Sequence, residues 1–115
     1  MNYTILIADD EPEIRTLLRL YLENENYQII EAENGKQALE LLKKEHVDLC
    51  LLDIMMPGMD GFALAQEIRT VDKALPILFI SARDDMPAKK KGFSIGIDDY
   101  LVKPVSMEVL VAKAQ

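Results

Sequence analysis

Short apolar runs alternate along the chain with segments of helical periodicity. The most apolar run, Val47–Leu52, ends at Asp53. It is too hydrophobic for a strand with one face in water, so it predicts a strand buried on both faces of a parallel sheet. Similar runs predict four further strands at Tyr3–Ala8, Tyr27–Ala32, Ile77–Ile80 and Tyr100–Val102. The run at Tyr27 is the more polar one, which favours a place near the sheet edge.

Amphipathic segments lie between these runs and predict five helices. The first begins at Pro12, where a missing backbone N–H costs nothing, and ends near Asn24. Its pattern predicts Ile14, Leu17, Leu18 and Tyr21 on the buried side, and Glu13, Arg15, Arg19 and Glu23 on the solvent side. The other helices are predicted at Gly35–Glu45, Phe62–Thr70, Met86–Ile95 and Met107–Gln115. Expected N-cap residues are Asn34, Asp60 and Ser106, and the last helix offers Val109, Leu110 and Ala112 for packing.

Five strands alternating with five helices predict an α/β fold, a doubly wound (βα)5 sandwich. Among the known doubly wound orders, 2-1-3-4-5, the flavodoxin-like order, suits this length and number of strands. The 115 residues fit a single domain, residues 1–115, and show no internal repeat or linker.

Composition narrows the possible functions. The net charge of −7 and the pI of about 4.6 argue against nucleic-acid binding by this segment itself, because no basic patch is available. No apolar run is long enough to cross a bilayer and no leader pattern is present, which predicts a cytoplasmic protein without membrane contact. The single cysteine, Cys50, lies inside a buried run and is expected to be structural.

Carboxylates follow two strands that the predicted order makes neighbours. Asp9 and Asp10 follow the first strand, and Asp53 follows the third. Ligands bind beyond the carboxyl ends of the strands in such sheets. Three grouped carboxylates repel one another, so a hard divalent cation, Mg²⁺ above all, is the expected partner. Glu11 adds negative charge, but it begins the helix and is expected to point away.

A structural explanation stays open for each of these acids when it is taken alone. Asp53 could simply end a strand in water, since strand ends are often polar. Acids such as Asp9, Asp10 and Glu11 also suit the first turn of a helix through its dipole.

Two further strand ends carry groups suited to a phosphoryl oxygen. Ser81 follows the fourth strand with a hydroxyl, and Lys103 follows the fifth with an ammonium group. Pro104 fixes the backbone next to Lys103 and can hold a cis bond. A cation, a hydroxyl and a lysine are the parts that stabilise a transferring phosphoryl group, and Asp53 is placed as the oxygen nucleophile.

With these residues in place, the sequence resembles the receiver domain of bacterial two-component response regulators over nearly all of its length. The resemblance is carried by Asp9–Asp10, Asp53, Met56–Gly61, Ser81–Ala82 and Lys103–Pro104. It implies that Asp53 accepts a phosphoryl group from the phosphohistidine of a sensor histidine kinase. It also implies Mg²⁺, for which Mn²⁺ can substitute, bound by Asp10, Asp53 and the backbone carbonyl of Met55, with Asp9 acting through a water. Lys103 and Ser81 are then the phosphoryl contacts.

The same resemblance assigns a switch role to Tyr100, whose ring turns inward when Ser81 moves toward the phosphate. The stretch Gly92–Tyr100 is similar to receivers that precede winged-helix DNA-binding domains. Such receivers dimerise through the helix 4, strand 5 and helix 5 face by ion pairs, for which Lys89–Lys91 and the acids Asp98, Asp99 and Glu108 would serve. DNA would then be contacted only through an effector domain that this chain lacks, and the last helix, ending at Gln115, is expected to be truncated.

Two other functions compete with the regulatory switch. A Mg²⁺-dependent phosphohydrolase with an aspartyl-phosphate intermediate generally needs a second acid two residues after the nucleophile, and Met55 stands there. A module that is never phosphorylated would not need the complete set of acids, hydroxyl and lysine. The expected chemistry is therefore at most self-phosphorylation from small donors and slow autodephosphorylation, not turnover of an outside substrate.

Overall fold

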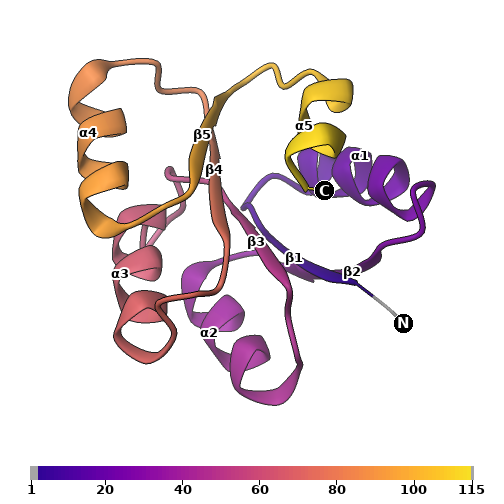
Figure 1. Cartoon of the computed structure of the whole chain (residues 1–115), viewed down its shortest axis with the longest axis horizontal. Coiled ribbons are helices and arrows are strands. Elements are labelled where there is room, and N and C mark those ends of the chain that lie inside the picture. Colours follow the sequence, from indigo (N-terminus) through magenta and orange to yellow (C-terminus); the bar gives the residue numbers. More distant parts are fainter. Residues whose placement is uncertain (1–2, 115) are drawn as a thin grey trace.

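The computed structural model describes residues 3–114 and has a central sheet with helices on both faces (Figure 1). The five strands are all parallel and lie in the order β2-β1-β3-β4-β5, which confirms the predicted topology. The strands are β1 (Thr4–Ala8), β2 (Gln28–Ala32), β3 (Leu49–Leu52), β4 (Ile77–Ser81) and β5 (Asp99–Val102). The more polar β2 stands at an edge, as its composition predicted.

Four helices connect the strands of the described residues, a fifth follows β5, and all begin close to the predicted residues. They are α1 (Pro12–Glu23), α2 (Gly35–Lys44), α3 (Gly61–Val71), α4 (Met86–Ile95) and α5 (Met107–Ala114). The side chains of Asn34 and Asp60 accept hydrogen bonds from the N–H groups of Gln37 and Ala63, so these two predicted N-caps are confirmed. The third, Ser106, accepts a longer hydrogen bond of 3.4 Å from the N–H of Val109. The predicted end of the last helix, Gln115, lies outside the described residues.

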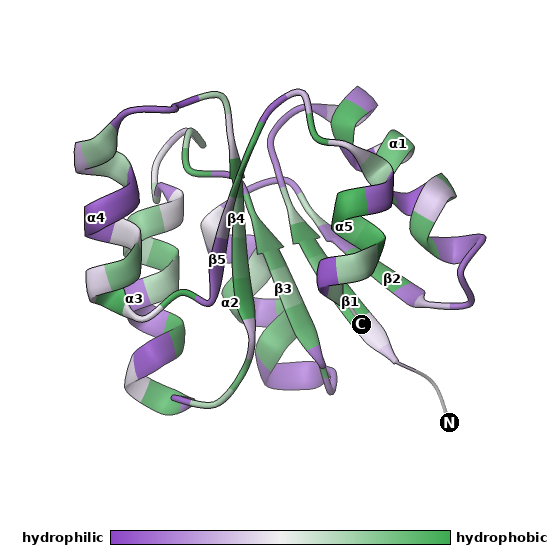
Figure 2. Cartoon of the chain, turned by 45° about the horizontal axis from the view of Figure 1, so that its top comes forward, coloured by the Kyte–Doolittle hydropathy of each residue, from purple (hydrophilic) through white to green (hydrophobic). Residues whose placement is uncertain are grey.

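Two apolar clusters hold the sheet between its helix layers. Leu18, Leu22 and Leu110 cover one face from α1 and α5, against strand residues such as Ile7 and Leu51. The other face carries α2, α3 and α4 and includes a larger set of buried residues, among them Ala38, Phe62, Leu64, Ile68, Phe79 and Ala88. Figure 2 shows largely hydrophobic central strands, whereas the helices alternate hydrophobic and hydrophilic residues.

The predicted buried stripe of α1 is partly wrong. Leu18 is buried and Ile14 is half-buried, but Leu17 is 51% exposed and Tyr21 is 37% exposed. The helix lies over β2 with only α5 beside it, so Leu18 and Leu22, one turn apart, make the contact and the adjoining side stays open. For the same reason Val109 and Ala112 of α5 are exposed, while Leu110 and Ala114 pack inward.

Two further features match the sequence. Cys50 is fully buried in β3, and burial raises the pKa of its thiol to about 12. The bond between Lys103 and Pro104 is cis. Within residues 3–114, none of the helices combines the length and apolar character that a bilayer crossing requires.

Candidate functional site

The two neighbouring strands β1 and β3 bring Asp9 and Asp53 together at their carboxyl ends. The backbone N–H of Asp53 donates to the carbonyl of Ala8 at 2.9 Å, which fixes where the two chains leave the sheet. Both side chains are buried, Asp9 being 2% exposed and Asp53 4%. Burial of two carboxylates is costly unless charge or hydrogen bonds compensate it, which marks this sheet edge as a functional site.

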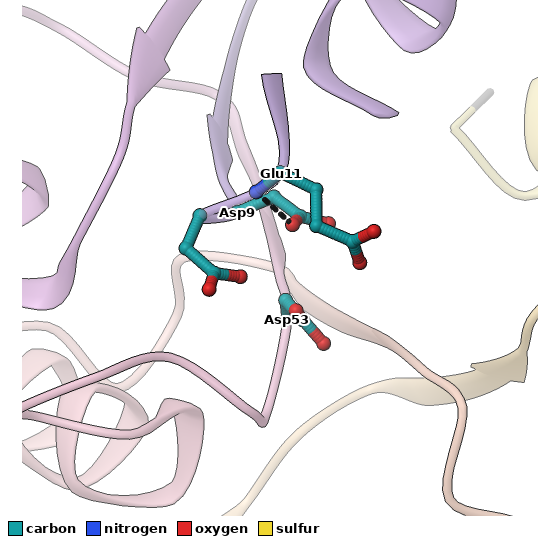
Figure 3. A group of neighbouring side chains, drawn as sticks. Asp9, Glu11 and Asp53 are labelled. Atoms are coloured by element: carbon teal, nitrogen blue, oxygen red, sulfur yellow. Dashed lines mark hydrogen bonds between the residues drawn. The ribbon is translucent and has the colours of Figure 1, made fainter. Parts of the chain in front are cut away.

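Four acids meet at this edge. One carboxylate oxygen from each of Asp9, Asp10, Glu11 and Asp53 lies within 4.8 Å of the others, and Figure 3 labels Asp9, Glu11 and Asp53 among the side chains drawn at the site. The expectation that Glu11 points away is wrong. Its N–H donates to Asp9 Oδ1 at 2.9 Å, which tightens the turn, and its Oε1 accepts a hydrogen bond from Lys103 Nζ at 3.3 Å.

Lys103 reaches this acidic group from the end of β5. Its Nζ lies 3.1 Å from Asp9 Oδ2 and 3.6 Å from Asp53 Oδ2, and its side chain is only 16% exposed. Burial by itself lowers the pKa of Lys103, but the negative charges of Asp53 and Asp9 outweigh it, so the pKa is raised. The ammonium group therefore stays charged and supplies a cation that faces the buried carboxylates.

The carboxyl group of Asp53 has a strongly shifted pKa. Burial raises its pKa from 3.8 to about 6, Asp9 adds to the rise, and Lys103 opposes it. A cation beyond Lys103 would lower that pKa and relieve the repulsion. The donor set consists of hard oxygen ligands, and their oxygens are close enough to converge on one ion, so these residues fit a divalent cation such as Mg²⁺.

The loop after Asp53 packs against the start of α3 without room for a side chain. A Cβ on Gly61 would lie 2.4 Å from the carbonyl oxygen of Asp53 and 2.7 Å from Cα of Ile54. The N–H of Gly61 donates to the carbonyl of Ile54 at 2.8 Å. Gly61 therefore allows the start of α3 to approach the backbone of Asp53 closely. Met55, exposed beside it, donates its N–H to Asp53 Oδ1 at 3.4 Å.

Ser81 ends β4, and Tyr100 lies on the neighbouring strand β5 opposite Phe79, two residues before the position opposite Ser81. Ser81 is fully buried and its Oγ accepts from the N–H of Arg83 at 3.1 Å. Tyr100 is 9% exposed, stands edge-on to Phe79, and donates its hydroxyl to the carbonyl of Arg83 at 2.7 Å. The ring is therefore already inside the fold, although the family resemblance predicts that it turns inward on phosphorylation.

The sequence reasoning missed Arg15, which it placed in solvent. Its side chain is 13% exposed, and Nη1 donates to the backbone carbonyl of Asp9 at 2.6 Å. Its Nε also pairs with Glu31 on β2 at 3.1 Å. One signal in the sequence could have found it. Arg15 and Arg19 are one helical turn apart, and the predicted edge strand beside this helix carries an acid, Glu31, that both can reach.

The chain is similar to known proteins over nearly its whole length. The response regulator receiver domain family matches residues 5–115. The chain is 46% identical over 115 residues to Response regulator GtcR from Aneurinibacillus migulanus, which is all of this chain and 47% of that relative. It is 47% identical over 111 residues to Transcriptional regulatory protein ResD from Bacillus subtilis, 96% of this chain and 46% of that relative. The chain thus spans about half the length of these curated relatives.

Solved structures agree on the fold. Response regulator protein TrrA from Thermotoga maritima, solved in complex with Mg²⁺ and BeF, superposes with a TM-score of 0.88 at 37% identity, covering 98% of this chain and 99% of that one. Chemotaxis protein CheY4 from Vibrio cholerae reaches a TM-score of 0.93 at 29% identity, with 98% and 96% covered. Receivers are regulatory phosphoacceptor domains rather than enzymes acting on outside substrates. The chain belongs to the response regulator receiver domain family.

Proposed function

We propose that this chain is a phosphorylation-controlled switch whose phosphoacceptor is Asp53. The observation that carries the proposal is the burial of Asp53 between Asp9 and Lys103, with a pKa raised to about 6. A carboxylate of that pKa is mostly ionised at neutral pH and more nucleophilic than a solvated one. Lys103 stands beside it to receive the charge of an incoming phosphoryl group.

The transfer is a displacement at phosphorus. An Asp53 oxygen would attack phosphorus in line while the bond from phosphorus to the histidine nitrogen of the kinase breaks. Lys103 and Ser81 would contact the phosphoryl oxygens and hold the product acyl phosphate. Asp10, Asp53 and the carbonyl of Met55 would hold Mg²⁺, with Asp9 acting through a water. When bound, Mg²⁺ neutralises charge on the phosphoryl oxygens.

The kinase must dock close enough to place its phosphohistidine at Asp53. The exposed side of α1 meets that requirement, because Leu17 and Leu20 are 51% and 63% exposed there. Leu17 borders a mostly apolar hollow of about 330 Å³ whose rim includes Lys103 and Pro104. An apolar patch beside the reacting group favours a protein partner over a small substrate.

The test of the phosphoacceptor uses intact mass. Acetyl phosphate with Mg²⁺ should add one phosphoryl group to the wild-type chain and none to Asp53→Asn. Chelation of the metal should prevent the addition. Equal labelling of the variant would remove Asp53 from the role, and labelling without a divalent ion would remove the metal from it.

Phosphorylation should also change the surface formed by α4, β5 and α5, and through it the assembly state. Three of the charged residues expected to join two copies form ion pairs with other residues of the same chain. Asp98 pairs with Arg69, Asp99 with Lys113, and Lys89 with Asp84. The better candidates for the centre of a symmetric contact are Met86 and Phe93 of α4, which are 61% and 49% exposed, seven residues apart on one helix.

Sedimentation with and without a beryllofluoride phosphate mimic tests this surface. The mimic should shift the chain toward a dimer, and Phe93→Ser should weaken the shift. High salt should matter little if the contact is mainly apolar. A chain that binds the mimic and stays monomeric at high micromolar concentration would contradict the dimer. The output is proposed to be transcriptional control through a DNA-binding domain on the same protein, because ResD is a transcriptional regulatory protein and both relatives are about twice this length.

A further inference from the structure

Arg15 connects three parts of the fold at the edge of the phosphoacceptor site. Nη1 donates to the backbone carbonyl of Asp9 at 2.6 Å, and Nε pairs with Glu31 at 3.1 Å. One guanidinium group thus ties α1 to the edge strand β2 and to the turn that leaves β1. The planar fork of arginine can make both contacts at once, which an ammonium group cannot do with the same geometry.

Every polar atom of Asp9 takes part in a hydrogen bond. The N–H of Asp9 donates to Ala32, Oδ1 accepts from Glu11, Oδ2 accepts from Lys103, and the carbonyl accepts from Arg15. By contrast the exposed carboxylate of Asp10 has no hydrogen-bond or ion-pair partner among residues 3–114. Something other than its own side-chain contacts must therefore direct Asp10 toward Asp53.

The peptide bond between Asp9 and Asp10 supplies that direction. The carbonyl of Asp9 and the N–H and Cα of Asp10 lie in one rigid plane, because the peptide bond does not rotate. A bond that fixes the carbonyl therefore also fixes the position from which the Asp10 side chain projects. With the plane in its present tilt, one carboxylate oxygen from each of the four acids lies within 4.8 Å of the others.

We propose that Arg15 is a positioning residue for the divalent-cation site. It holds the plane between Asp9 and Asp10, so that the Asp10 carboxylate stands ready beside Asp53 before the cation binds. This inference rests on the proposed function, since it assigns a role within the same site. Arg15 does not touch the reacting atoms, and it acts only through the backbone.

The matched control is Arg19, one helical turn along α1. It also pairs with Glu31, and it bonds Glu23 and the carbonyl of Ile29, but it does not touch the acidic site. Arg15→Ala and Arg19→Ala both remove an ion pair to the same acid. Only the first releases the carbonyl of Asp9, so a difference between the two variants isolates that contact.

Calorimetric titration with Mg²⁺ alone, and thermal melts with a chelator present, make the measurement. Both alanine variants should lower the melting midpoint by similar amounts. Only Arg15→Ala should weaken Mg²⁺ binding, by about three- to tenfold. This loss is somewhat smaller than the loss expected when a side chain that hydrogen-bonds directly to a metal ligand is removed. Arg15→Lys should restore most of the affinity, because its ammonium group can still donate to Asp9. At saturating Mg²⁺ the rate of phosphorylation by acetyl phosphate should return to within about twofold of wild type.

Each other outcome counts against the inference. If Arg15→Ala binds Mg²⁺ as tightly as Arg19→Ala, Arg15 is merely structural. A loss of affinity in Glu31→Gln equal to that in Arg15→Ala would make the ion pair responsible instead of the carbonyl contact. Should the alanine variants not fold, Arg15→Met against Arg19→Met repeats the comparison with a longer side chain that cannot donate a hydrogen bond, and equal affinities overturn the proposal. A wild-type chain that binds no Mg²⁺ would instead refute the proposed function, which separates the two failures.

Discussion

Replacing Asp53 with asparagine should stabilise the metal-free protein. The carboxylate is 4% exposed, and burial with the nearby charge of Asp9 raises its pKa from 3.8 to about 6. Each pKa unit corresponds to about 1.4 kcal/mol, so the charged form costs about 3 kcal/mol in the fold at neutral pH. Asparagine has nearly the same shape and no charge. Because its amide must still find partners, we expect a gain of about 1–3 kcal/mol in the free energy of unfolding.

The sign of the pH dependence follows from the same shift. A folded pKa above the unfolded value means that the folded state binds the proton of Asp53 more tightly. That contribution to stability is complete below the unfolded pKa of 3.8, and it is lost as the pH rises through about 6. Between about pH 5.5 and pH 7.5 the wild type should lose about 0.8 kcal/mol through this group, and Asp53→Asn should not.

Urea unfolding followed by circular dichroism, with chelator present, measures both quantities. The lower pH stays above the pI of about 4.6, where the protein would become poorly soluble. The gain from Asp53→Asn should be larger at the higher pH by about 0.8 kcal/mol. A variant less stable than wild type at neutral pH would refute the reasoning, since it would mean that the pair with Lys103 outweighs burial.

Two other variants test neighbouring parts of the site. Asp10→Ala should abolish Mg²⁺ binding and phosphorylation without lowering the melting midpoint in chelator, because this exposed carboxylate adds repulsion; a clearly lower midpoint would show a structural role. Gly61→Ala should cost about 1–3 kcal/mol in urea unfolding and slow phosphorylation, because its Cβ would overlap the carbonyl of Asp53. Gly58→Ala, whose φ of +76° strains alanine but whose Cβ would meet no atom within 4 Å, should reduce stability while leaving the rate near wild type; equal rates in both glycine variants would contradict the role of Gly61.

The strand order and the ends of the strands could be predicted because they depend on coarse patterns. Apolar runs such as the one around Cys50 favour a parallel sheet buried on both faces, and the alternation with helices limits the order. The order then places Asp9 next to Asp53 without knowledge of any side-chain contact. The helix starts were predicted nearly as well, because Asn34 and Asp60 cap helices by a local hydrogen bond.

Features that depend on a neighbouring element could not be predicted in the same way. Which side of α1 faces solvent depends on how the neighbouring helix packs against it. Leu17 and Tyr21 were therefore wrongly predicted on the buried side. Arg15 and Glu11 read as ordinary helix-surface charges, and only their distant partners Glu31 and Lys103 give them a place in the site. Gly61 likewise shows its role only when the carbonyl of Asp53 is seen against it.

The buried, unreactive thiol of Cys50 can report on the opening of the sheet. A thiol with a pKa of about 12 in the middle of β3 reacts with an alkylating reagent only when the sheet opens. It is the only cysteine of the chain, so the rate of its modification, in excess reagent, measures how often the central strand becomes accessible. The same protection allows a cysteine introduced at an exposed position to be labelled selectively in the native protein. Distance or exchange measurements on the switch can therefore begin from the natural sequence, with Cys50 left in place.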